Sequence, residues 1–85
     1  MAPIEVLAQG GGAFQVRVEG WSFAVTASDG LAGELGAPDA EALVRQSFAF
    51  LLEREPVGSI LPRFDLTMIE RYFPEWRTEM RSRWR

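Results

Sequence analysis

The sequence predicts a two-layer α+β domain, in which an antiparallel sheet of residues 3–28 is covered by a long helix and a C-terminal helical unit. Two observations carry this prediction. Apolar and polar residues alternate with period two over residues 14–28, which is typical of strands with one buried face. Over residues 39–55 the apolar residues follow a helical period instead. A chain of 85 residues has enough material for one modest core, so we expect a single domain over residues 1–85.

The N-terminal part is expected to form a three-stranded β-meander over about residues 3–28. Residues 3–8 form a short apolar run, and the glycines at 10–12 predict a turn or flexible loop. The dipeptide Glu19-Gly20 separates two alternating segments, which predicts a hairpin. The expected core face of this hairpin consists of Phe14, Val16, Val18, Trp21, Phe23 and Val25. The segment 29–38 is rich in glycine and predicts a loop that includes one helical turn.

The first long helix is expected over about residues 39–55. Pro38 suits a first helical position, and Glu41 and Arg45 are spaced for an ion pair one turn apart. The apolar side chains span a wide arc of this helix, so we expect it to pack against the sheet on one side and a later helix on the other. They are Leu43, Val44, Phe48, Phe50, Leu51 and Leu52.

The segment that follows is interpreted as a connector to two further helices. Residues 53–55 would form a solvated last turn, because Pro56 and Gly58 stop the helix. Ile60 and Leu61 are expected to return to the core. Asp65 is a good N-cap for a helix over about 65–73, and Pro74 ends that helix or starts a third one over about 74–84.

Residues 47–76, "SFAFLLEREPVGSILPRFDLTMIERYFPEW", resemble a family of small bacterial proteins with a signature of the form SF-x-FLLEREP-x-x-SIL-x-x-FDL-x-x-I-x-RYFPE followed by an aromatic residue. Here that aromatic residue is Trp76, where tyrosine is more usual. The family has no assigned activity, so the resemblance implies relatives and assigns no function to any residue.

Composition removes several classes of chemistry. The chain has no histidine and no cysteine, so it lacks the commonest general base, thiolate nucleophiles and the usual zinc ligands. We assign no catalytic, cofactor-binding or metal-binding residues and expect no enzyme. Glu53, Glu55 and Asp65 are interpreted as a solvated helix end and a cap, the alternative being an acid/base pair or a weak Ca²⁺ or Mg²⁺ site. The N-terminus resembles no export signal and no stretch resembles a membrane span, so a cytoplasmic location without membrane association is expected.

Charge is divided unevenly within a net charge of −3. Residues 1–44 carry one arginine and six acids, whereas residues 45–85 carry eight arginines and six acids. Trp76, Met80 and Trp84 form one apolar stripe at helical spacing, and Arg77, Arg81 and Arg85 form a parallel row. This arrangement favours a helix docked on the core, with contact to nucleic acid or to a protein partner as alternatives.

The sequence therefore favours a small, non-catalytic binding or regulatory module that acts through contacts with a protein partner or a second copy of itself. The alternative is a nucleic-acid-associated accessory protein that uses the C-terminal tail, although overall acidity argues against it. A third alternative is an enzyme that uses carboxylates alone. The candidate interaction surface consists of Arg71, Tyr72, Trp76, Arg77, Arg81, Trp84 and Arg85.

Overall fold

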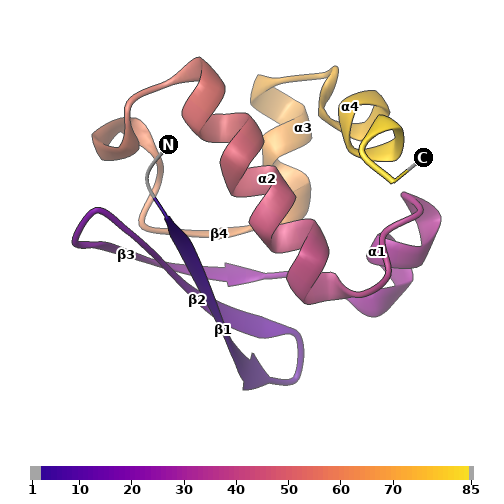
Figure 1. Ribbon diagram of the computed structural model, residues 1–85, viewed down its shortest axis with the longest axis horizontal. Helices are drawn as coiled ribbons and strands as arrows, with labels where there is room; N and C mark the ends of the chain where they lie inside the picture. The colour runs from indigo at the N-terminus through magenta and orange to yellow at the C-terminus, as the bar shows by residue number, and fades with distance from the viewer. Residues whose placement is uncertain (1–2, 85) are drawn as a thin grey trace.

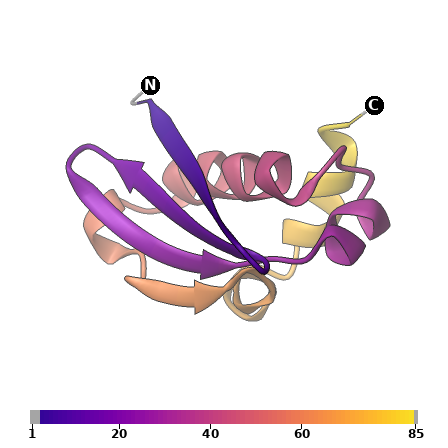
Figure 2. The same cartoon turned by 90° about the horizontal axis from the view of Figure 1, so that it is seen from below.

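A four-stranded sheet carries its helices on one face in the computed structural model, which describes residues 3–84 (Figure 1). The sheet consists of β1 (Ile4–Gly10), β2 (Ala13–Val18), β3 (Trp21–Thr26) and β4 (Arg63–Asp65). The helical elements are α1 (Asp29–Glu34), α2 (Ala40–Arg54), η1 (Val57–Ser59), η2 (Leu66–Met68), α3 (Ile69–Tyr72) and α4 (Trp76–Ser82). The strands lie side by side in the order β1-β2-β3-β4 (Figure 2). The predicted α+β class with an antiparallel meander is confirmed.

The hairpin between β2 and β3 forms where the alternation predicts it. Val16 lies opposite Phe23 in antiparallel register, and Val18 lies opposite Trp21. The two turn residues, Glu19 and Gly20, both have positive φ, 50° and 84°. Two positive φ values in a two-residue turn match the twist of the flanking strands, which is why glycine is favoured there.

The fourth strand has no counterpart in the sequence prediction, which treats residues 63–64 as a connector and begins a helix at about residue 65. Residues 63–65 form β4, which pairs in parallel with β3 and places Val25 opposite Phe64. Parallel neighbours need a crossover connection. Here the chain between β3 and β4 contains α1 and α2, so the long helix that covers the sheet lies within this connection.

Helix α2 begins at Ala40, two residues later than Pro38 would suggest. Asp39 is the N-cap, and its carboxylate accepts a hydrogen bond of 2.8 Å from the backbone N–H of Ala42. Pro38 therefore precedes the cap and is not the first helical residue. Arg45 donates to the backbone carbonyl of Ile4 on β1, and no ion pair joins it to Glu41 within residues 3–84.

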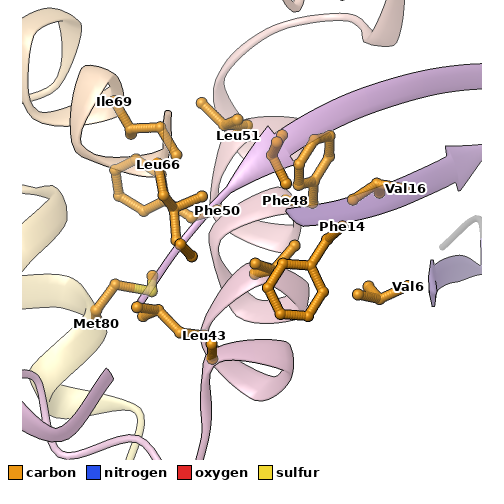
Figure 3. Packing of buried hydrophobic residues seen from close by; sticks show 14 of the residues in the cluster. Val6, Phe14, Val16, Leu43, Phe48, Phe50, Leu51, Leu66, Ile69 and Met80 are labelled. Atoms are coloured by element: carbon orange, nitrogen blue, oxygen red, sulfur yellow. The ribbon is translucent and has the colours of Figure 1, made fainter. Parts of the chain in front are cut away.

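The core lies between the sheet and α2 and continues on the other side of α2 toward α3 and α4 (Figure 3). The predicted apolar arc of α2 is confirmed, because all its members are buried except Leu52, which is half-buried. Phe48 faces the sheet, with its ring centroid 5.3 Å from that of Phe23. Phe50 faces the C-terminal helices, with its ring centroid 5.8 Å from that of Phe73.

The C-terminal part is more broken than the sequence suggests. The helix expected over 65–73 is divided into η2 and α3, and the helix expected over 74–84 is reduced to Trp76–Ser82. Asp65 does act as an N-cap, but for the short η2. Within the described part of the chain, no helix has the length and apolarity that crossing a membrane requires.

Candidate functional site

The predicted tryptophan stripe packs on the core. Trp76 is 0 % exposed, and its indole N–H donates a hydrogen bond of 3.0 Å to the hydroxyl of Ser47 on α2. Met80 is also fully buried, with its sulfur 3.7 Å from the same hydroxyl. Trp84 is half-buried against the core. The stripe therefore docks α4 onto α2, and Trp76 is not available at the surface.

The arginine row is partly neutralised by acidic side chains of the same chain. Arg77 lies 2.9 Å from Glu70 and 3.2 Å from Glu34. Its hydrogen bond to Glu70 raises the pKa of Arg77 and lowers the pKa of Glu70. Arg81 is exposed and has no ion-pair partner among residues 3–84, whereas Arg85 lies outside the described residues.

The sequence predicts that Arg54 is solvated in the last turn of the helix. In the structure its guanidinium contacts other side chains instead. Its guanidinium lies 3.6 Å from the centroid of the Phe50 ring, a cation–π contact. It also forms ion pairs with Glu75 at 3.3 Å and Glu79 at 3.7 Å. These contacts join the C-terminal end of α2 to α4 and give Arg54 a structural role.

The three carboxylates considered for catalysis or metal binding have different surroundings. Glu53 forms ion pairs with Arg54 and Arg83, and Glu55 is the C-cap residue of α2. Asp65 lies on β4, on the exposed side of the sheet. No group of three or more acidic side chains suited to a metal ion occurs within residues 3–84.

Asp65 joins β4 to β3 through side-chain hydrogen bonds. Its carboxylate accepts a hydrogen bond of 2.6 Å from the hydroxyl of Thr26 and is also bonded by the hydroxyl and the backbone N–H of Thr67. Partial burial raises the pKa of Asp65, but the bonds from Thr26 and Thr67 outweigh burial and bring this pKa below its ordinary value. These contacts are those of a cap and a strand link.

An apolar groove of about 170 Å³ lies between the end of α2, β4 and α3. Its lining includes Leu51, Ile60, Leu61, Phe64, Ile69 and Tyr72, with Glu55 as the acidic member. Leu61 is 47 % exposed and Tyr72 is 65 % exposed. Tyr72 thus belongs to the groove, whereas Arg71, although exposed, does not line it.

The exposure of Leu61 corrects the expectation that it returns to the core together with Ile60. Ile60 is buried, with 8 % of its surface exposed. Successive side chains of an extended segment point in opposite directions, so only one of two neighbours can face the core. The extended conformation expected near Pro62 is the signal that could have identified Leu61 as a surface residue.

Trp21 is a second correction, because the alternation assigns it to the core and it is 50 % exposed. Trp21 is the first residue of β3, and Gly58 of η1 lies against its ring. There the edge of the indole ring lies over Gly58, 3.5 Å from the position that a Cβ would occupy. Because glycine has no side chain, it covers only this edge of the ring. The remainder of the ring faces outward.

Comparison with known proteins found no match to a family model, a curated protein or a solved structure. The family resemblance of residues 47–76 therefore stays a prediction. Any function proposed for this chain rests on the geometry of residues 3–84.

Proposed function

We propose that this protein is a small cytoplasmic binding module without catalytic activity, which acts by contacting another protein. Its contact surface is the apolar groove together with Trp21, and we refer to Trp21, Leu61 and Tyr72 as the exposed apolar set. The observation that carries the proposal is the position of this set. It contains three of the four exposed large hydrophobic side chains found within residues 3–84.

Two members of this set line the groove, and the third lies against a residue next to its lining. Leu61 and Tyr72 line the groove, and Trp21 rests on Gly58 of η1, next to the groove-lining Ser59. Large exposed side chains that gather around a hollow indicate an interaction site, whereas scattered ones need no explanation. Tyrosine and tryptophan are the residue types that most often dominate the binding energy of protein interfaces.

The nucleic-acid alternative has less support. Stacking on bases requires exposed aromatic rings, and phosphate contacts require free cations. Trp76 is buried, and Arg77 is held by Glu34 and Glu70. We therefore place the contact surface at the groove instead of the C-terminal tail.

Selection from a phage-displayed library of random peptides about 16 residues long tests the proposal, because such peptides can occupy a groove of this kind. The selected peptides should bind the wild-type protein and lose binding to the double variant Leu61→Ser/Tyr72→Ser. Leu7→Ser is the matched control, because Leu7 is 38 % exposed on the open side of the sheet, away from the groove. Circular dichroism checks that both variants stay folded.

Two outcomes would contradict the proposal. Either the library yields no peptide that binds the folded protein, or the selected peptides bind the double variant as well as the control. Light scattering over a range of concentrations separately decides whether the partner is a second copy, since a strict monomer at high concentration removes that partner.

A further inference from the structure

A second cleft adjoins the C-terminal end of α2, with a volume of about 290 Å³. Its lining includes the apolar side chains of Leu52 and Val57 together with three carboxylates, those of Glu19, Glu53 and Glu55. Glu55 lines both this acidic cleft and the apolar groove. The two hollows therefore share one acidic side chain at the end of the helix.

Two of these carboxylates form no ion pair within residues 3–84. Glu53 is paired with Arg54 and Arg83, but Glu19 and Glu55 have no ion-pair partner among the residues that the structure describes. The C-terminus of a helix adds a partial negative charge through its free carbonyl groups. Here α2 ends at Arg54, directly before Glu55. Two carboxylates without an ion-pair partner among residues 3–84 therefore lie at this end of α2, beside Arg54, whose guanidinium donates to the backbone carbonyl of Phe50.

From this arrangement we infer that the partner is a basic apolar segment of a protein, with a large apolar side chain for the groove and an arginine or lysine beside it for Glu55 and Glu19. This inference rests on the proposed function and adds the charge of the partner to it. When an apolar residue of the partner binds in the groove, the adjacent residues of the partner lie close to Glu55, because Glu55 forms part of the groove lining. Complementary charge next to an apolar anchor sets the orientation of the partner and excludes acidic segments.

Two synthetic peptides of about 14 residues test the inference, since this length spans one amphipathic helix. Both contain leucine and phenylalanine at the same apolar positions and no tryptophan. One carries arginine and the other glutamate at the polar positions. Binding is followed through the intrinsic fluorescence of the three tryptophans, of which Trp21 is half-exposed and Trp76 is buried, and calorimetry gives the dissociation constants.

The arginine peptide should bind, and the glutamate peptide should bind much more weakly or not at all. Glu55→Gln and Glu19→Gln should each weaken binding of the arginine peptide about two- to fivefold, the range expected for exposed ion pairs. Its affinity should also fall when salt is raised from about 50 mM to about 500 mM. The matched control is Glu41→Gln, which changes the net charge equally at the other end of α2 and should leave affinity unchanged.

Three results would overturn the inference. These are equal binding of both peptides, failure of the arginine peptide to bind, and a loss in Glu41→Gln as large as that in Glu55→Gln, which would indicate attraction by net charge alone. The proposed function fails separately. If library peptides depend on Leu61 and Tyr72 but contain no excess of basic residues, the groove is a binding site and only the inferred charge of its partner is wrong.

Discussion

The indole N–H of Trp76 donates a hydrogen bond of 3.0 Å to the hydroxyl of Ser47, and both side chains are 0 % exposed. This bond joins α4 to α2 through two residues that lie 29 positions apart in the chain. It explains how a tryptophan can be completely buried, since its only side-chain donor has a partner. It also makes Ser47 the buried polar residue on which the C-terminal helix depends.

Ser47→Ala should therefore lower the free energy of unfolding by about 1–3 kcal/mol, because the indole N–H is left buried without an acceptor. Urea denaturation measures this loss. Ser22→Ala is the control, because Ser22 is exposed on the open side of the sheet. Equal effects of the two substitutions would mean that the bond to Trp76 contributes nothing to stability.

Met80→Ala should lower the free energy of unfolding by about 2–5 kcal/mol, since it leaves a cavity between α4 and α2. The neighbouring Arg81 is exposed, so Arg81→Ala should change stability little. Thermal denaturation compares the two variants. A stable Met80→Ala protein with an unchanged melting temperature would contradict the docking of α4 onto the core.

Phe23→Ala should lower the free energy of unfolding by about 3–5 kcal/mol, enough to unfold many small domains. Phe23 is 2 % exposed and packs against Phe48, whereas Trp21 on the same strand is 50 % exposed. Trp21→Ala should therefore cost much less, although tryptophan is the larger residue. Denaturant titration of both variants decides whether burial or residue size controls the loss, and a larger loss for Trp21→Ala would refute the structural assignment.

Asp65→Asn should reveal the pH dependence of the link between β3 and β4. The hydrogen bonds of Asp65 lower its pKa in the folded protein below the ordinary value of 3.8. The ionised carboxylate therefore stabilises the fold above that ordinary pKa, and this contribution disappears as the pH falls through the folded pKa. Stability curves between about pH 6 and about pH 2.5 should show the advantage of wild type over Asp65→Asn shrinking toward acid.

Thr26→Val provides the partner control for this measurement, because it removes the hydroxyl that donates to Asp65. In a Thr26→Val background the effect of Asp65→Asn at neutral pH should be smaller than in wild type. An undiminished effect would assign the stabilisation to the cap on Thr67 alone.

Elements with local signals can be predicted from the amino-acid sequence alone. Alternation with period two and the Glu19-Gly20 turn predict the β2–β3 hairpin, and a wide apolar arc predicts that α2 packs on the sheet and on a later helix. Both patterns arise from the geometry of a single strand or helix, so a window of neighbouring residues is enough to detect them. The docking of Trp76 and Met80 follows from the same periodicity.

The surface at the end of α2 depends instead on contacts between distant segments, which no local pattern records. A three-residue strand such as β4 is too short to show a period, and its Asp65 is linked to Thr26, 39 residues earlier. Alternation assigns Trp21 to a face of its strand but cannot tell where the helix covering that face ends. Trp21 is half-exposed, and Glu53 forms ion pairs whereas Glu55 forms none among residues 3–84. These features arise only when the folded chain brings η1, α2 and α4 together.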